Sequence, residues 1–280
     1  MTTDTNGIKR IASNYYKKLL TAETITEDAK CARSEVWNSM QRKVTSEMNS
    51  ELTLPISDME LRNVVQNMTA SCCPGEDGLS IVFFQTYWDI IGDAVREVCN
   101  HIIDSGVMPQ GMAACLILMI PKGNSQAVDV EKWRPITLLN TIYKIYAKVL
   151  SIRIQKFLPM LIHSSQTGFI KERSILDNIF VFWEAVAWAK KSKQNLAILL
   201  LDFEKAYDRV DWSFLEGTME QMGFSTKWIK AVSTMYCNAS SKVLIGGGKG
   251  SPSGFRDQLD KAARWLHFCF FFLQKQCRLI

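Results

Sequence analysis

One stretch of this 280-residue chain joins an apolar run to an acidic end. Residues 196–201 are continuously apolar, Asp202 follows them directly, and Tyr207 and Asp208 come shortly afterwards. A buried strand that ends in a carboxylate can present that carboxylate to a divalent metal ion. The same residues also fit a strand-to-helix turn in which the acidic group caps the next helix. By itself, the stretch leaves both interpretations open.

Two cations stand at the edges of predicted elements. Lys122 comes just after an apolar strand expected over 112–120, and Arg134 comes just before an expected helix. A triphosphate needs cations that converge from different parts of a fold, and arginine adds a bidentate fork. Alternatively, Arg134 pairs with a nearby carboxylate such as Glu131 on a surface turn.

Positive charge is concentrated in the middle of the chain. The formal net charge is +5, whereas residues 122–175 alone hold nine Lys or Arg against three Asp or Glu, an excess of six. An uneven basic excess of this kind is typical of a surface that faces a polyanion. A solvated basic face without a ligand is the other interpretation.

Composition bounds the class of protein. With 47% hydrophobic and 22% charged residues, the chain can bury a core and is not of the disordered class. Its eight cysteines form no C-x-x-C pair and no zinc-type spacing with the three histidines, which favours a reducing compartment. The first residues are polar, and no apolar run approaches the ~20 residues of a membrane span. We therefore expect an intracellular location, in nucleus or cytoplasm, without secretion or a membrane partner.

The helices and strands that would position these residues are predicted from the spacing of apolar residues and from residues that typically begin or end a helix or strand. Helices are expected over 8–50, over 58–68 behind a capping box of Ser57 and Glu60, and from about 81 to Ser105. A strand over 112–120, a helix after 136, and a helix from Ser174 with Asp177 as capping partner come next. The strand over 196–201, two helices separated at Gly223 and a short strand over 242–245 complete the order. This order predicts an α+β fold, or α/β, with a small sheet.

Four segments, taken in order, resemble the reverse transcriptases of non-LTR (LINE-type) retrotransposons. They are Pro74–Leu79 (PGEDGL), Ile120–Lys122 with Trp133–Ile136 (IPK and WRPI), Gln166–Phe169 continuing to Arg173–Ile175, and Asp202–Asp208. The resemblance covers roughly residues 70–245. It implies a right-hand polymerase-like fold that contains the fingers and the first part of the palm, helix-rich and incomplete at the C-terminus. Residues 1–69 are then a helical N-terminal extension, 70–250 a partial reverse transcriptase domain and 251–280 a divergent tail.

The resemblance also implies roles for individual residues. Asp202 would hold catalytic Mg²⁺, and Tyr207 would lie under the sugar of the incoming nucleotide and exclude a 2′-hydroxyl. Lys122 and Arg134 would reach the triphosphate. The template path would be lined by Gln166, Gly168, Phe169 and Arg173. The implied partners are an RNA template, a DNA primer and deoxynucleoside triphosphates.

Alternative roles stay open for several of these residues. Gly168 and Phe169 also fit a turn that inserts into the core, the Gln166 amide a cap on a backbone group, and Tyr207 a core aromatic. If the family roles hold, Asp202 ends a central strand and faces the same cleft as Arg134 and Lys122.

The family pattern fails after the acidic stretch. Phosphoryl transfer of this type uses two metal ions ~3.5–4 Å apart, held by carboxylates from several strands. The family takes two of these from an aromatic-Ala-Asp-Asp hairpin, yet no Asp-Asp pair occurs in this chain. The glycine-rich segment 246–251 does not have the spacing of a phosphate-binding loop. After about residue 250 the sequence loses its family likeness, which suggests a truncation or an altered reading frame.

Three functional hypotheses remain at this point. The first is a reverse transcriptase fragment, an RNA-directed DNA polymerase by descent that we expect to be inactive by itself. The second is a non-catalytic nucleic-acid-binding module, and the third is a degenerate relic without a biochemical role. Binding of nucleic acid without polymerisation distinguishes the second from the first.

Overall fold

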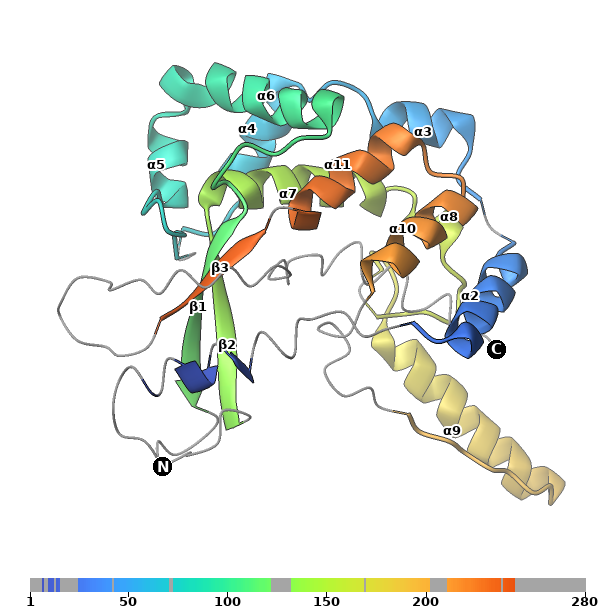
Figure 1. Cartoon of the computed structure of the whole chain (residues 1–280). Helices are drawn as coiled ribbons and strands as arrows, with labels where there is room; N and C mark the ends of the chain where they lie inside the picture. Colours follow the sequence, from blue (N-terminus) through green and yellow to red (C-terminus); the bar gives the residue numbers. More distant parts are fainter. Residues whose placement is uncertain are drawn as a thin grey trace.

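A helix-rich body surrounds one end of a small sheet in the computed structural model of the chain (Figure 1). The structure describes residues 7, 10–12, 14–15, 25–41, 43–70, 73–121, 132–168, 170–201, 211–237 and 239–244. The helices are α2 (Glu27–Ser39), α3 (Ser46–Leu52), α4 (Asp58–Gln66), α5 (Ile81–Thr86), α6 (Trp88–Ser105), α7 (Thr141–Gln155), α8 (Leu158–Leu161), α9 (Ile175–Ser192), α10 (Trp212–Gln221) and α11 (Thr226–Cys237). The strands are β1 (Ala114–Pro121), β2 (Trp133–Leu139) and β3 (Ser240–Leu244). The predicted α+β class is confirmed.

The sheet is mixed and has the strand order β2-β1-β3. β1 pairs with β2 in antiparallel register from Cys115 opposite Leu139 to Pro121 opposite Trp133, and with β3 in parallel register. Pro135 lies within β2, and an edge strand tolerates it because a proline without an N–H costs nothing on the open side. Arg134 therefore belongs to strand β2, which precedes α7, and the prediction that Arg134 stands just before a helix was wrong.

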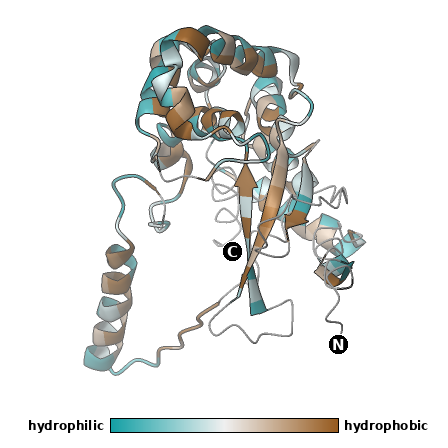
Figure 2. Cartoon of the chain, turned by 90° about the vertical axis from the view of Figure 1, so that its left-hand side faces the viewer, coloured by the Kyte–Doolittle hydropathy of each residue, from teal (hydrophilic) through white to brown (hydrophobic). Residues whose placement is uncertain are grey.

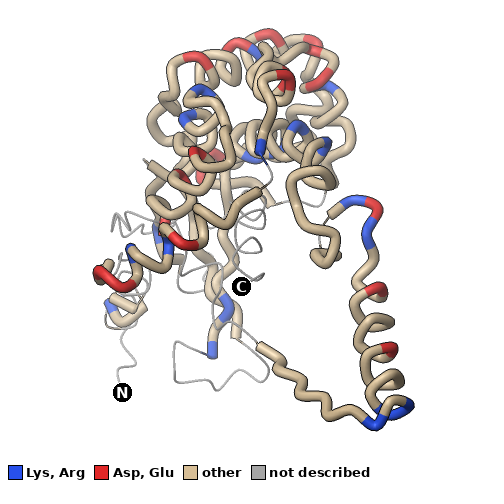
Figure 3. Tube along the Cα trace, turned by 90° about the vertical axis from the view of Figure 1, so that its right-hand side faces the viewer, with Lys and Arg blue, Asp and Glu red and all other residues tan. Residues whose placement is uncertain are grey.

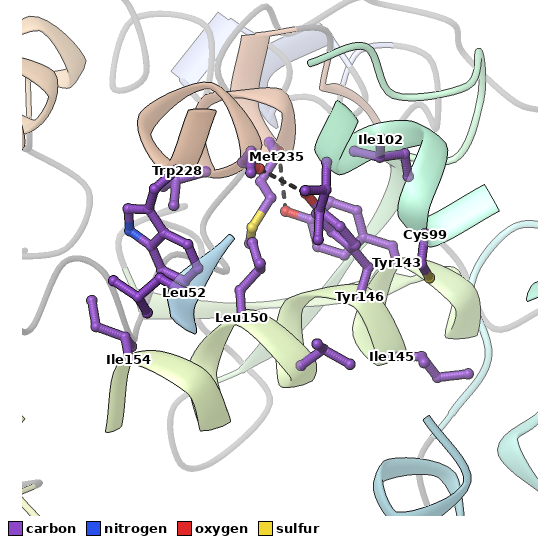
Figure 4. Packing of buried hydrophobic residues seen from close by; sticks show 14 of the residues in the cluster. Leu52, Cys99, Ile102, Tyr143, Ile145, Tyr146, Leu150, Ile154, Trp228 and Met235 are labelled. Atoms are coloured by element: carbon purple, nitrogen blue, oxygen red, sulfur yellow. Dashed lines mark hydrogen bonds between the residues drawn. The ribbon is translucent and has the colours of Figure 1, made fainter. Parts of the chain in front are cut away.

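Helix α7 lies at the centre of the core. Nine of its residues are buried, and the two tyrosines among them each use the hydroxyl group to reach α11. The Tyr143 hydroxyl donates to the Met235 carbonyl and the Tyr146 hydroxyl to the Ala231 carbonyl, both at 3.0 Å (Figure 4). Both tyrosine hydroxyls are therefore satisfied inside the core, and they hold α7 and α11 in register.

A buried arginine ties the other end of α7 to the N-terminal helices. The Arg153 side chain is 6% exposed and grips both Glu60 carboxylate oxygens at 2.7 and 2.8 Å, with further bonds to the Leu52 and Leu54 carbonyls. The Ser57 hydroxyl caps α4 as predicted. The reciprocal half of the predicted capping box is wrong, because the Glu60 carboxylate is used by the guanidinium instead of by the backbone of Ser57.

Most predicted elements are confirmed with shifted boundaries. The helical stretch to Ser105 is divided at Tyr87 into α5 and α6. The capping box of Ser174 and Asp177 opens α9. Gly223, at φ 85°, makes the left-handed turn between α10 and α11.

The strand predicted over 196–201 is wrong. These residues form no strand, and five of the six side chains are large, apolar and exposed, from 43% at Leu196 to 83% at Leu200. A strand needs a backbone neighbour, and among the described strands β1, β2 and β3 pair only with one another. Helix α9 and residues 194–201, here called the arm, project together from the body (Figures 1 and 2).

Residues on both sides of the predicted boundary near residue 69 share one core. Leu52, Leu61 and Val64 belong to the same cluster of buried side chains as Tyr146 and Trp228. The division into 1–69, 70–250 and 251–280 thus stays a prediction, and the third part lies outside the described residues. Within the described part of the chain, every helix is too short or too polar to cross a membrane.

Replacing Arg153 with methionine should lower the free energy of unfolding by about 3–5 kcal/mol, because Glu60 is left partly buried without its partner. Urea denaturation measures this change. The matched control is Lys156→Met, which removes an exposed ion pair with Glu51 and should cost less than about 1 kcal/mol. Equal costs for the two variants would contradict the structural role assigned to Arg153.

Candidate nucleotide and nucleic-acid interface

The paired ends of β1 and β2 hold one of the two predicted triphosphate-binding cations, Arg134. Pro121 stands opposite Trp133 and Ile120 opposite Arg134. Lys122 itself lies outside the described residues. Arg134 is exposed on the edge strand.

One face of the sheet is open around Arg134. Residues paired across an antiparallel ladder share a face, so Ile120 and Arg134 lie together, next to the Leu118–Ile136 pair. The exposed fractions of Leu118, Ile120 and Ile136 are 37%, 39% and 43%. The opposite face carries Ile117, which is buried against Tyr15 and Val243. The open face therefore offers an apolar floor with a guanidinium at its margin.

The second group of predicted site residues forms a compact loop after α8. Gln166 is buried, and its side-chain amide donates to the Gly168 carbonyl at 2.9 Å. This contact agrees with the alternative that the amide caps a backbone group. Phe169 lies outside the described residues, so its two interpretations are untested.

Arg173 organises this loop from within. Its two terminal nitrogens donate four hydrogen bonds of 2.7–3.1 Å, all to backbone carbonyls, those of Pro159, Ile162, His163 and Gln166. Each terminal nitrogen has two N–H groups, so this set uses them completely. The geometry thus gives Arg173 a structural task in addition to the template contact predicted from the sequence.

Sequence reasoning missed the residue that holds the 73–79 loop. Asn140, at the junction of β2 and α7, accepts a hydrogen bond from the Asp77 N–H and donates to the Gly111 carbonyl. A Cβ on Gly75 would lie 2.2 Å from the Asn140 side-chain oxygen, so only glycine fits there. A polar residue between a strand and a helix was the available signal, although it would have indicated a helix cap.

The same junction makes further contacts with this loop. The Thr141 hydroxyl donates to the Leu79 carbonyl, the Lys144 ammonium donates to the Cys73 carbonyl at 2.6 Å, and Lys242 of β3 pairs with Glu76. The PGEDGL loop is thereby fixed to the end of β2, the strand that carries Arg134.

The Lys and Arg residues of 122–175 fall into two groups, those that bind protein groups and those that remain exposed. Arg153 and Lys156 are paired with acidic groups from α4 and α3, and Lys144 and Arg173 bind backbone carbonyls. Figure 3 shows that Lys and Arg residues are spread over the described part of the molecule. The exposed cations of this region include Arg134, Lys148 and Lys171. The surface available to a polyanion is therefore smaller than the sequence count indicates.

The acidic site predicted from the sequence falls outside the described residues. Asp202, Tyr207 and Asp208 lie in the gap between residues 201 and 211, so their placement relative to Arg134 is not tested. Among the described residues, no group of three or more His, Cys, Asp or Glu side chains is placed to hold a metal ion. Asp211, by contrast, has a structural role, because it is the N-cap of α10 and pairs with Arg33.

Two cysteine thiols have a raised pKa. Burial raises the pKa of Cys99 to about 12. Burial, with a smaller effect of the Glu216 carboxylate, also raises the pKa of Cys237, while a hydrogen bond with Ser233 opposes the shift. A raised pKa keeps a thiol protonated and weakens it as a nucleophile, so neither group suits covalent catalysis.

Comparison with known proteins shows similarity to reverse transcriptases and to proteins of mobile elements. The family described as reverse transcriptase (RNA-dependent DNA polymerase) matches residues 120–278. A 149 kDa protein of transposon TX1 from Xenopus laevis is 34% identical over 90% of this chain. The RNA-directed DNA polymerase of the mobile element jockey from Drosophila melanogaster is 25% identical over 61% of the chain, and a Pol polyprotein of retrotransposable element R2 from Nasonia vitripennis is 22% identical over 75%. The chain spans about one fifth of the length of these relatives.

Replacing Arg173 with lysine should lower the free energy of unfolding by about 2 kcal/mol, because lysine keeps the charge but not the fork that serves four carbonyls. Amide hydrogen exchange should rise in residues 163–170. Lys171→Ala, two residues away and exposed, is the control and should change neither quantity. Unchanged exchange in Arg173→Lys would show that the loop does not depend on the guanidinium.

Proposed function

This chain belongs to the reverse transcriptase family of non-LTR retrotransposons, and we propose that it supplies the fingers and first palm portion of an RNA-directed DNA polymerase. The observation that supports this proposal is the β1–β2 register, which sets Arg134 opposite Ile120 on the open sheet face. The predicted domain division, with a reverse transcriptase part over 70–250, belongs to the same proposal.

We assign the open face to the incoming deoxynucleoside triphosphate. A nucleotide has a flat apolar base and a polyanionic tail, and the face offers an apolar floor with a guanidinium at its margin. Arg134 would bind the phosphates with its bidentate fork, and Lys122 would add a point charge from the neighbouring strand. Ile120 and Ile136, both partly exposed beside Arg134, would contact the base or sugar.

The loop from Gln166 to Arg173 would contact the template. Its backbone is shaped by the Arg173 bonds and by the Gln166 amide, so Gly168 can approach a nucleic-acid strand in a fixed conformation. In this proposal Phe169 supplies a ring at the template path, and Arg173 acts chiefly by holding the loop.

The chemistry proposed for the acidic stretch rests on Asp202 and Tyr207. Asp202 would hold a Mg²⁺ ion, which lowers the cost of charge building up on the transferred phosphoryl group. Tyr207 would exclude a ribose 2′-hydroxyl by contact. One aspartate, with Asp208 as the next candidate in the stretch, does not complete a two-ion site. We therefore propose that the chain by itself binds substrates without polymerising them.

The partners in this proposal are an RNA template, a DNA primer and deoxynucleoside triphosphates. A non-catalytic nucleic-acid-binding module is the second candidate, favoured by the exposed cations Arg134, Lys148 and Lys171. We also propose an intracellular location, which is supported by the absence of a C-x-x-C pair among the eight cysteines of the sequence.

Replacing Arg134 with glutamine should weaken binding of a fluorescent deoxynucleoside triphosphate about tenfold, as expected for the loss of a charge-assisted bond worth ~1.5–3 kcal/mol. Fluorescence anisotropy at low salt measures the dissociation constant. Arg96→Gln is the control, because Arg96 lies on α6 in an exposed pair with Asp93. Equal losses in both variants would mean that only net charge matters, and no loss in either would reject the assigned site.

The purified chain should show no template-directed DNA synthesis on an RNA template with Mg²⁺ or Mn²⁺, even where it binds the primer–template. A primer-extension assay tests this expectation, and binding measured over a range of salt should fall steeply as salt rises. Incorporation that disappears in Asp202→Asn would show that another carboxylate, such as Asp257 or Asp260, completes the site. Binding that does not respond to salt would argue against phosphate contacts.

A further inference from the structure

The open sheet face is closed at one end, where β2 leads into α7. Alternate residues of a strand share a face, so Arg134, Ile136 and Leu138 follow one another along it over about 13 Å, at ~3.3 Å per residue. Ile136 is 43% exposed, and Leu138 is partly buried. Asn140, two residues further along, is buried. The face therefore loses its exposure step by step toward α7.

The third strand reaches the same end of the face. Leu116 of β1 stands opposite Leu138 on one side and in parallel register with Lys242 on the other, so the three residues form one row across the sheet. The Lys242 side chain is 20% exposed and forms an ion pair with Glu76 of the PGEDGL loop. Since Asn140 binds the same loop just beyond β2, the loop lies across the end of the face from β2 to β3.

The PGEDGL loop has a defined conformation of its own. The Gly78 N–H donates to the Gly75 carbonyl at 3.3 Å, and the Leu79 N–H donates to the Asp77 carboxylate at 3.0 Å. The Asn140 side-chain oxygen accepts the Asp77 N–H at 3.3 Å. A Cβ on Gly75 would lie 2.3 Å from the Asn140 backbone nitrogen, so the loop lies directly against the end of β2. These contacts make the loop a boundary with a fixed position.

We propose that the PGEDGL loop is the end wall of the nucleotide face, and that Asn140 and Lys242 are the positioning residues that hold it there. The inference rests on the proposed function, in which Arg134 binds the phosphates at the opposite end. A nucleotide anchored by Arg134 places its sugar and base along the apolar floor, toward the loop. The end wall then limits the position of the nucleoside, whereas a bare triphosphate stays near Arg134 and does not reach the loop.

A comparison of two ligands tests this inference on the whole 280-residue chain. An unlabelled deoxynucleoside triphosphate and inorganic tripolyphosphate each displace the fluorescent nucleotide, and the readout is the ratio of their dissociation constants. A change of net charge acts on both polyanions and therefore cancels in the ratio, whereas unfolding abolishes both affinities. Displacement of the end wall should weaken binding of the nucleotide alone.

The ion pair between Glu76 and Lys242 allows a charge exchange. Glu76→Lys and Lys242→Glu each bring like charges together. Each should raise the dissociation constant of the nucleotide about fivefold relative to that of tripolyphosphate, because a displaced loop leaves part of the nucleoside in water. The double variant restores an ion pair of reversed polarity at unchanged net charge, and it should return the ratio to the wild-type value.

Substitutions at the β2 side of the loop supply an independent test. Gly75→Ala forces a methyl group into the end of β2, and Asn140→Ala removes the hydrogen bond with the Asp77 N–H, so both should raise the same ratio. Gly78→Asn is the matched control in the same loop. Asparagine tolerates the φ of 70°, and an added Cβ meets no atom within 4 Å, so the ratio should not change.

The results separate the end wall from the nucleotide face. If both ligands bind and Arg134→Gln weakens both, an unchanged ratio in Gly75→Ala and in the two charge variants rejects the end wall and leaves the nucleotide face intact. A double variant that keeps the raised ratio of the single variants would overturn the role of Lys242. If the wild type binds neither ligand, the nucleotide face itself is rejected, and the end wall with it.

Discussion

The burial of α7 is the constraint on which the rest of this structure depends. Nine of its fifteen residues are buried, and Tyr143, Tyr146 and Arg153 among them carry polar groups that find partners inside the core. Each satisfied group fixes another element: the Tyr143 and Tyr146 hydroxyls fix α11, and the Arg153 guanidinium fixes the turn before α4. The side-chain hydrogen bonds of α7 thus connect segments that are distant in the sequence.

The same helix connects the two parts of the proposed interface. Its first residue follows the strand that carries Arg134, and its last turn leads through α8 into the loop of Gln166 and Arg173. Asn140, just before the helix, holds the 73–79 loop against the end of β2. If the proposed nucleotide face and template loop hold these substrates, their positions at the two ends of one buried helix keep the substrates at a constant separation.

Positive charge has two distinct uses in this protein. Arg153 and Arg173 bring cations to places where several carbonyl or carboxylate oxygens converge, and there the planar fork of arginine satisfies many acceptors at once. Arg134, Lys148 and Lys171 remain exposed. Only the second set can exchange water and counterions for phosphate, so a count of basic residues overstates the strength of nucleic-acid binding.

The sequence by itself determined the fold class, the family and most helices. Local signals act over a few residues and hold in any context: Ser57 and Asp211 cap their helices, Ser174 and Asp177 close a capping box, and Gly223 makes its turn. The motifs of the family could likewise be read in order without coordinates.

Tertiary structure alone decided which partners these residues have. The sequence around Glu60 fits a capping box, but in the folded chain its carboxylate binds the buried guanidinium of Arg153 from α7. Arg134 lies in a strand because β1 is its hydrogen-bonding neighbour. Residues 196–201 have the composition of a strand but, among the described residues, no strand beside them. The physical reason is common to all three: a helix cap is satisfied within one turn of chain, whereas an ion pair or a strand depends on a neighbour that only the assembled fold supplies.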